Sequence, residues 1–105
     1  MEIKLFYFDG CPTWQVGLEN LKAALAAEGL EARIRLVKVA DDDEAARLMF
    51  LGSPSFRVDG VDWCPEDRKR YNLSCRVYQT PQGLKGTPTV EMLREKLRQT
   101  CSRTG

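Results

Sequence analysis

The chain of 105 residues has 43% hydrophobic and 30% charged side chains, with 16 basic groups against 15 acidic ones and a formal net charge of +1. Each residue fixed on folding costs roughly 1–2 kcal/mol of backbone entropy, so a chain this short must place most of its apolar side chains in one core. These values exclude two independent domains, and the balanced charge gives no reason to expect a nucleic acid as a partner. Because the chain has no histidine, it cannot build a Cys-His or Ser-His nucleophile pair by itself.

The start of the chain and its apolar runs bear on where the protein is found. Residues 1–8 lack a basic region followed by a long apolar stretch and a small-residue cleavage site, so they are not typical of a signal peptide. No apolar run reaches the roughly 20 residues that span a bilayer. We therefore expect a cytoplasmic protein with no membrane partner. In a reducing cytosol its cysteines are expected to begin as thiols; they are Cys11, Cys64, Cys75 and Cys101.

The first half of the chain alternates strands and helices. The apolar run over 3–8 predicts a strand buried on both faces. Apolar residues then recur every three or four positions over 12–29, which indicates a helix. Residues 32–39 alternate in polarity and predict a second strand. A second helix is expected to begin at Asp41, because its side chain can cap the helix while Glu44 reaches back three residues later.

The second half of the chain is less regular. Pro54 opens a short strand over 55–58, since a proline cannot donate a hydrogen bond within a sheet. The stretch at about 60–74 is polar and of mixed charge, which indicates a surface insertion rather than a linker. Residues 75–79 predict a fourth strand, and a last helix follows with Pro88 in its first turn. The predicted order is strand, helix, strand, helix, strand, strand, helix.

Two positions in this order resemble the thioredoxin-like superfamily. Cys11 lies between the first strand and the first helix, and Pro54 lies at the start of the third strand. In that superfamily an active cysteine begins the first helix, and a cis-proline beside it opens the third strand. The resemblance covers nearly the whole chain. It implies one thioredoxin-like α/β domain over residues 1–105, with a four-stranded mixed sheet flanked by three helices. It also implies a cis bond between Ser53 and Pro54 close to Cys11.

The residues that follow Cys11 depart from the superfamily pattern. Where a second cysteine or a serine would stand, the string Cys11-Pro12-Thr13-Trp14 has a tryptophan, which removes the ordinary dithiol cycle. Three strings more closely resemble a small group of uncharacterised bacterial thioredoxin-like proteins, some of which are labelled alkylmercury lyase. These strings are Phe8-Asp9-Gly10-Cys11-Pro12, Gly52-Ser53-Pro54-Ser55 and Leu73-Ser74-Cys75-Arg76-Val77-Tyr78.

Cys11 is the candidate nucleophile. A thiol at the cap of a helix faces unpaired amides and the positive end of the helix dipole, which favour the thiolate and lower the pKa of the cysteine. The alternative is a small apolar residue that fills the top of the sheet. Trp14 likewise either packs on the core or shields Cys11 and presents an aromatic surface to a partner. The residues expected at this site are the catalytic Cys11 and Pro54, with Pro12, Thr13, Trp14 and Ser53 on the surrounding surface.

Cys64 and Cys75 bracket the insertion and leave two alternatives open. If the usual topology of the superfamily holds, they lie near each other at the end of the sheet opposite Cys11, where they either form a disulfide or stay reduced. On that topology Cys75 opens the fourth strand at the far end of the sheet. A strand of about five residues, at about 3.3 Å each, separates this end from Cys11, so we expect no bond between Cys11 and Cys75. No metal is expected, because the chain lacks the paired C-x-x-C knuckles of a zinc site.

The sequence leaves three hypotheses about function open. The leading hypothesis is a thiol-redox protein, a thiol-disulfide oxidoreductase without the C-x-x-C resolving cysteine. In it Cys11 forms a mixed disulfide with a protein or a low-molecular-weight thiol, and a second molecule resolves this bond. No organic cofactor is implied. One alternative is a catalytically inactive thioredoxin-fold binding module that uses the surface around Cys11, Trp14 and Pro54. The other is a thiolate binder of a soft metal or a mercurial.

Overall fold

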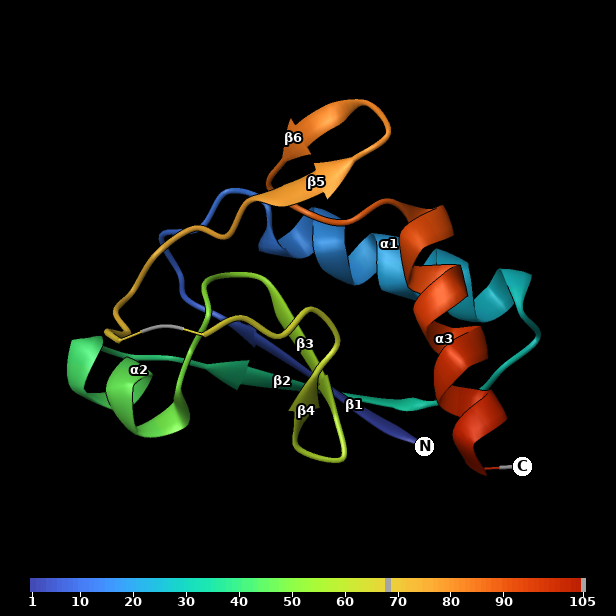
Figure 1. The fold of residues 1–105 in the computed structure, drawn as a ribbon, viewed down its shortest axis with the longest axis horizontal. Coiled ribbons are helices and arrows are strands. Elements are labelled where there is room, and N and C mark those ends of the chain that lie inside the picture. Colours follow the sequence, from blue (N-terminus) through green and yellow to red (C-terminus); the bar gives the residue numbers. More distant parts are fainter. Residues whose placement is uncertain (68, 105) are drawn as a thin grey trace.

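The structure is a computed structural model that describes residues 1–67 and 69–104, with the backbone alone for residues 101–104. None of the helices formed by these residues combines the length and the hydropathy that a bilayer-spanning segment needs. Figure 1 shows the elements, which are β1 (Glu2–Tyr7), α1 (Trp14–Ala27), β2 (Arg33–Lys38), α2 (Asp42–Leu48), β3 (Ser55–Val58), β4 (Val61–Asp62), β5 (Tyr78–Thr80), β6 (Gly83–Lys85) and α3 (Val90–Thr104).

The central sheet has four strands in the order β2-β1-β3-β4. β1 is parallel to β2 and antiparallel to β3, and β3 is antiparallel to β4. Leu5 of β1 lies between Leu36 of β2 and Phe56 of β3. The predicted α/β class, with a four-stranded mixed sheet and three helices, is confirmed for the described residues.

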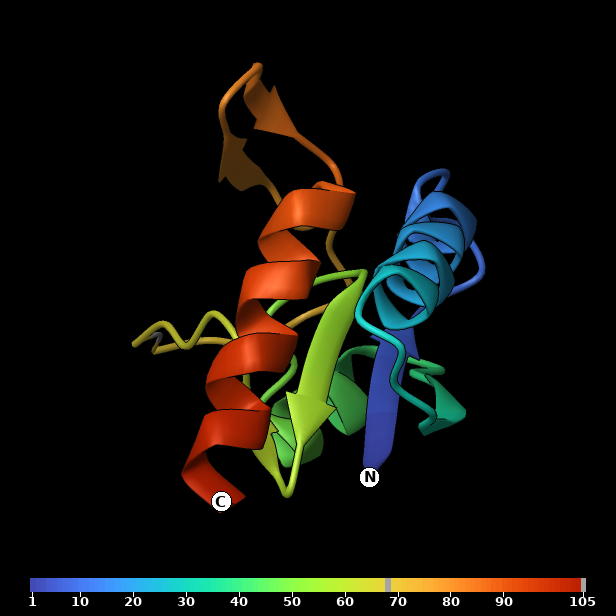
Figure 2. The same cartoon turned by 90° about the vertical axis from the view of Figure 1, so that its right-hand side faces the viewer.

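Helices cover both faces of the sheet. α1 and α3 pack side by side on one face (Figure 2), where Leu21 and Leu97 meet Leu5 in the larger core. α2 lies against the other face, where Ala45 packs in a smaller core with Phe6. Neighbouring residues of a strand point to opposite faces, so Leu5 and Phe6 serve different cores. This confirms the prediction that the first strand is buried on both faces.

α2 begins at the predicted cap. The side chain of Asp41 accepts a hydrogen bond from the amide of Glu44 at 2.8 Å, and the carboxylate of Glu44 accepts one from the amide of Ala40 at 3.0 Å. The first bond satisfies an amide that the first turn of a helix leaves unpaired, and the second ties the residue before the cap to the helix. The helix ends at Leu48, and Met49 follows in the left-handed conformation with φ of 54°.

The fourth strand of the sheet is not the one predicted at 75–79. β4 consists of Val61 and Asp62, which follow β3 after a two-residue turn at Asp59 and Gly60 with φ of 54° and 79°. A turn with both residues at positive φ joins adjacent antiparallel strands directly, because its twist matches that of the strands. The prediction was wrong because it treated this turn as the start of the insertion.

The rest of the predicted insertion and the first residues of the predicted fourth strand form one segment over 63–77, called the insertion below, of which all residues but 68 are described. It passes from the end of β4 back to the start of β3, where Cys75 forms a bridge with Ser53 (Figure 1). It leads into the β5–β6 hairpin, a separate two-stranded sheet in which Tyr78 lies opposite Lys85. The observed order of elements therefore differs from the predicted order by this hairpin ahead of α3.

Candidate functional site

The candidate site lies at one end of the sheet, where β1 ends and β3 begins. Because β1 and β3 are antiparallel with Phe6 opposite Ser55, the residues ahead of β3 fall next to the loop that follows β1. That loop turns immediately, since the amide of Cys11 donates to a backbone carbonyl three residues earlier at 3.1 Å. The peptide bond between Ser53 and Pro54 is cis, as predicted. Cys11 and the proline turn are thus neighbours because of the strand pairing.

The thiol of Cys11 is held by hydrogen bonds. Its Sγ donates to the backbone carbonyl of Ser53 at 3.4 Å and lies 3.4 Å from Oγ1 of Thr13. Only 4% of the residue is exposed. The sulfur is therefore fixed between the two loops, with narrow access from solvent.

Cys11 lies two residues ahead of the N-cap of α1 rather than at the cap. The helix begins at Trp14, and Thr13 is its N-cap residue, although the Thr13 side chain makes no capping hydrogen bond. The Thr13 hydroxyl instead contacts the sulfur of Cys11 and donates to the carbonyl of Gly86 at 3.2 Å. The side chain of the N-cap residue therefore bonds outside the helix, to Gly86 and to the thiol.

Burial and hydrogen bonding shift the pKa of Cys11 in opposite directions. Burial acts to raise this pKa, because it disfavours the charged thiolate. Interactions with Ser53, and with the side chain and amide of Thr13, stabilise the thiolate, and a contact with Cys75 adds to them. Together they outweigh burial, so the pKa of Cys11 lies below its ordinary value. A lower pKa increases the fraction of the nucleophilic thiolate.

The hydroxyl of Ser53 is fully buried, and within the described part of the chain it has no hydrogen-bond partner at normal distance. A buried hydroxyl without a partner costs stability. Because Ser53 lowers the pKa of Cys11, ionisation of the thiol supplies a charged acceptor beside this hydroxyl. The unpaired group thus favours the reactive form of Cys11.

Cys75 lies beside Cys11, and the prediction that the two occupy opposite ends of the sheet was wrong. The amide of Ser53 donates to the carbonyl of Ser74 at 2.8 Å, and the amide of Arg76 donates to the carbonyl of Ser53 at 3.0 Å. This pattern makes Cys75 the parallel bridge partner of Ser53, whose carbonyl binds the Cys11 thiol, so the two cysteines are close enough for each to affect the pKa of the other. The strand that leads away from Cys11 does not carry Cys75 to the far end of the sheet, because the insertion returns to the start of β3 before it reaches Cys75.

The two neighbouring thiols differ in exposure and in acidity. Cys75 is exposed to solvent, whereas Cys11 is buried. Partial burial of its sulfur raises the pKa of Cys75, and the negative charge of an ionised Cys11 raises it further. At intermediate pH the pair therefore favours a thiolate on Cys11 and a protonated thiol on Cys75.

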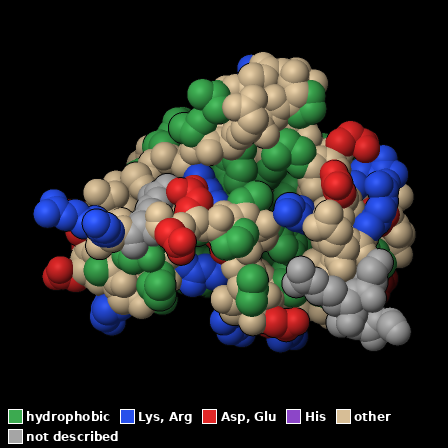
Figure 3. All heavy atoms as spheres, viewed as in Figure 1, with side chains coloured by type: hydrophobic (Ala, Val, Ile, Leu, Met, Phe, Trp, Pro, Cys, Tyr) green, Lys and Arg blue, Asp and Glu red, His purple; other side chains and the backbone are tan. Residues whose placement is uncertain are grey.

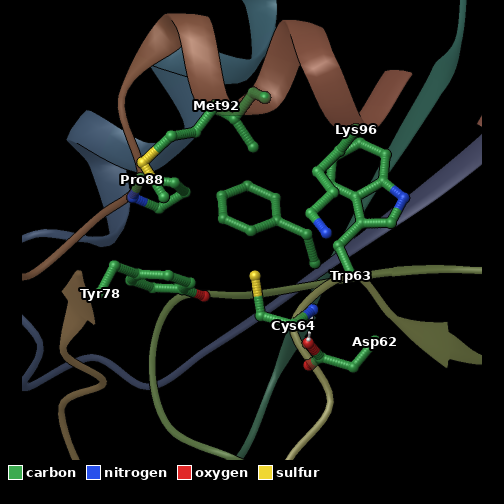
Figure 4. Close-up of a pocket in the computed structure, with 9 residues that line it drawn as sticks. Asp62, Trp63, Cys64, Tyr78, Pro88, Met92 and Lys96 are labelled. Carbon is green, nitrogen blue, oxygen red and sulfur yellow. Dashed lines mark hydrogen bonds between the residues drawn. The ribbon is translucent and has the colours of Figure 1, made fainter. Parts of the chain in front are cut away.

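Cys64 lies in a different place, a small pocket against α3. Figure 4 shows its sulfur pointing into this pocket, with Tyr78 on one side and Trp63 on the other. The free space is about 20 Å³, which is room for one water and too little for a substrate. In the view of Figure 1, Figure 3 shows hydrophobic side chains gathered in the middle of the molecule, below the β5–β6 hairpin. Burial raises the pKa of Cys64, as is typical of an unreactive structural cysteine.

The cysteines whose side chains the structure describes are all free thiols; they are Cys11, Cys64 and Cys75. The disulfide considered between Cys64 and Cys75 is thus not formed in this structure, and the thiol that Cys75 contacts is Cys11. The side chain of Cys101 lies outside the described residues.

Sequence reasoning missed Arg76, which anchors the insertion. Its side chain is 2% exposed and forms an ion pair at 2.9 Å with Asp62, which is 8% exposed. It also donates to the hydroxyl of Ser55 at 3.2 Å and to the carbonyl of Cys64. Gly52, with φ of 114°, permits this approach, because a Cβ there would lie 2.9 Å from Cβ of Arg76. An arginine within a polar segment gives no sequence signal of burial.

Trp14 has a packing role. Its ring stacks on Tyr7 with centroids 4.1 Å apart and 24° between the planes, and it packs against the larger core. Pro12 is exposed in the loop between β1 and α1. Of the residues predicted at the site, the structure brings Thr13 and Ser53 into contact with Cys11.

Among residues 1–67 and 69–104, no group of three or more histidine, cysteine, aspartate or glutamate side chains is placed to hold a metal ion. The contact between Cys11 and Cys75 provides two sulfur atoms.

No family model matches the chain, and neither does any curated protein or solved structure.

Proposed function

We propose that this protein is a thiol-disulfide redox protein with a thioredoxin-like fold, in which Cys11 is the nucleophile. The observation that carries the proposal is the set of contacts around the Cys11 sulfur. The thiol lies against the cis Ser53–Pro54 turn, and its hydrogen-bonding neighbours favour the thiolate despite burial. A thiolate stabilised in a fixed position is the requirement for thiol-disulfide exchange.

In the proposed reaction the Cys11 thiolate attacks one sulfur of a disulfide, R–S–S–R. The S–S bond breaks, a Cys11–S–S–R mixed disulfide forms, and the electron pair of the broken bond leaves on RS⁻. No group besides the two sulfur-containing reactants takes part in this exchange.

The geometry favours a low-molecular-weight disulfide over a protein disulfide as the substrate. The amide and the carbonyl of Ser53 already bond to Ser74 and Arg76, so the amide is no longer free to pair with an incoming peptide strand. Cys11 itself is 4% exposed. A small disulfide needs only narrow access to the sulfur, whereas a peptide substrate requires the segment over 74–76 to move aside.

The binding-module alternative has less support. It requires Trp14 and Pro54 to form a surface around Cys11. Pro54 is buried, and Trp14 is half-buried against Tyr7. A partner would therefore find little of this aromatic and proline surface to contact.

The pH dependence of alkylation tests the nucleophile. Reduced protein is treated with iodoacetamide across a pH series, and peptide mass spectrometry gives the midpoint of the rate for each cysteine. We expect the midpoint of Cys11 to lie below that of Cys64, because hydrogen bonds lower one pKa and burial raises the other. The midpoint, unlike the absolute rate, is independent of access to the sulfur. A Cys11 midpoint at or above that of Cys64 contradicts the proposal.

A further inference from the structure

We infer that Cys75 is the resolving thiol for Cys11 and that the two close an intramolecular disulfide. The inference rests on the proposed role of Cys11 as the nucleophile. A tryptophan at position 14 removes the resolving thiol that a C-x-x-C string would supply on the helix. The structure brings a thiol to the same sulfur from the insertion instead.

The carbonyl oxygen of Ser53 links the surroundings of the two cysteines. It accepts a hydrogen bond from Sγ of Cys11 at 3.4 Å and another from the amide of Arg76, the residue after Cys75, at 3.0 Å. Paired strands lie about 4.7–4.9 Å apart, so Cys75 lies one strand spacing from the backbone that binds the Cys11 thiol. A disulfide requires a Cα separation of up to about 7 Å, and the shared carbonyl of Ser53 places the two cysteines on neighbouring backbone segments.

The backbone on the C-terminal side of Cys75 is anchored while the side chain is exposed. Next to Cys75, the buried guanidinium of Arg76 pairs with Asp62. Further along, the hydroxyl of Tyr78 donates to the carbonyl of Pro54 at 2.5 Å. These contacts hold the segment against the proline turn. The exposed Cys75 side chain is thus held beside the proline turn that binds the Cys11 thiol.

The charge on Cys11 controls when Cys75 can react. While Cys11 is a thiolate, its negative charge raises the pKa of Cys75 and keeps that thiol protonated. When Cys11 enters a mixed disulfide, this charge disappears. The pKa of Cys75, which partial burial still raises, then loses the contribution from Cys11, and the fraction of the Cys75 thiolate increases for the second step.

In the second step the Cys75 thiol gives up its proton and its sulfur attacks Sγ of Cys11. The bond between Cys11 and the R group's sulfur breaks, a bond between the two cysteine sulfurs forms, and a second RS⁻ leaves. The proton from Cys75 passes to a released RS⁻. In total the Cys11 thiolate and the Cys75 thiol lose two electrons and become one disulfide, while R–S–S–R gains them and leaves as one RSH and one RS⁻.

The test follows the mixed disulfide in time. The reduced full-length protein, the Cys75→Ser variant and the matched control Cys64→Ser are mixed with oxidised glutathione, quenched with acid and mapped by mass spectrometry. At about 10 μM protein, a neighbouring thiol of millimolar effective concentration resolves the adduct about 100-fold faster than a second molecule does. We therefore expect the glutathione adduct on Cys11 to last about 100-fold longer in Cys75→Ser. Wild type and Cys64→Ser should yield a Cys11–Cys75 disulfide.

The outcomes separate this inference from the proposed function. An adduct on Cys11 that lasts as long in wild type as in Cys75→Ser overturns the inference, as does a Cys64–Cys75 disulfide, while both leave Cys11 as the nucleophile. Absence of any adduct on Cys11 in Cys75→Ser overturns the proposed function itself. Circular dichroism establishes that each variant folds, and Cys75→Ala repeats the measurement with a side chain that cannot donate a hydrogen bond.

Discussion

The acidity of Cys11 depends on two neighbouring residues that carry hydroxyl groups, Thr13 and Ser53. Thr13 stands at the N-cap of α1, yet its side chain makes no capping hydrogen bond and contacts the Cys11 sulfur instead. Ser53 is buried beside the same sulfur. A hydrogen bond to a charged group is worth more than one to a neutral group, so these residues favour the thiolate over the thiol.

Replacing Thr13 by valine tests this local effect. Thr13→Val keeps the shape of the side chain and removes the hydroxyl, so the pKa of Cys11 should rise and its alkylation midpoint should move to higher pH. The lost hydrogen bond to Gly86 should lower stability by about 1 kcal/mol. Thr13→Ser keeps the hydroxyl and should retain a midpoint near that of wild type. An unchanged midpoint in Thr13→Val would show that the hydroxyl does not act on the thiol.

At the scale of elements, α1 and α3 are joined by a charged contact at the end of α1. Glu28, the C-cap residue of α1, accepts a hydrogen bond from Arg94 of α3 at 2.8 Å and another from Arg98 at 2.9 Å. The hydrogen bonds from Arg98 and Arg94 lower the pKa of the Glu28 carboxylate. These ion pairs align two helices whose apolar faces already share the larger core.

The Glu28 contact should make stability depend on acid pH. A carboxylate whose pKa is lowered by folding stabilises the protein above its unfolded pKa, and this contribution is lost as pH falls through the folded pKa. Thermal melting should therefore show wild type more stable than Glu28→Gln at neutral pH, with the difference shrinking below the ordinary pKa of 4.5. Added salt should reduce it at neutral pH. Glu19→Gln, at an exposed position of α1, is the matched control. A difference that is constant with pH would contradict the ion-pair explanation.

At the scale of the whole molecule, one buried ion pair connects the sheet, the insertion and the candidate site. Asp62 belongs to β4, and Arg76 follows Cys75 in the insertion. Both side chains are buried, so neither charge can return to water without opening this part of the fold. The position of Cys75 therefore depends on a contact with the edge strand of the sheet.

Removing one charge of this pair should be costly. Asp62→Asn leaves the guanidinium of Arg76 buried without its main partner, and loss of one member of a buried pair typically costs about 3–5 kcal/mol. Urea unfolding should show a stability loss of about 3 kcal/mol or more. Asp59→Asn, in the exposed turn before β4, makes the same chemical change and should be nearly neutral, since asparagine also tolerates positive φ. Equal effects in the two variants would rule out a special role for the Asp62–Arg76 pair.

The elements with regular patterns were predictable from the sequence. The apolar run of β1, the apolar stripe of α1 and the capping residues Asp41 and Glu44 are local signals, and the structure has these elements at those positions. The short strand β4 and the β5–β6 hairpin were missed. Two or three residues are too few to show a period, so strands of this length depend on their partners rather than on their own pattern.

The candidate site, too, was predictable only in part. The sequence, through the resemblance of Cys11 and Pro54 to two positions of the thioredoxin-like superfamily, predicted that Cys11 lies beside a cis Ser53–Pro54 turn, and the structure has both features. Only the tertiary structure decided that Cys75 joins them. The path of the insertion is set by the buried guanidinium of Arg76 and by backbone bonds to Ser53, which are contacts between residues distant in the chain. Such contacts leave no periodic signal, because they depend on where the folded sheet places a partner.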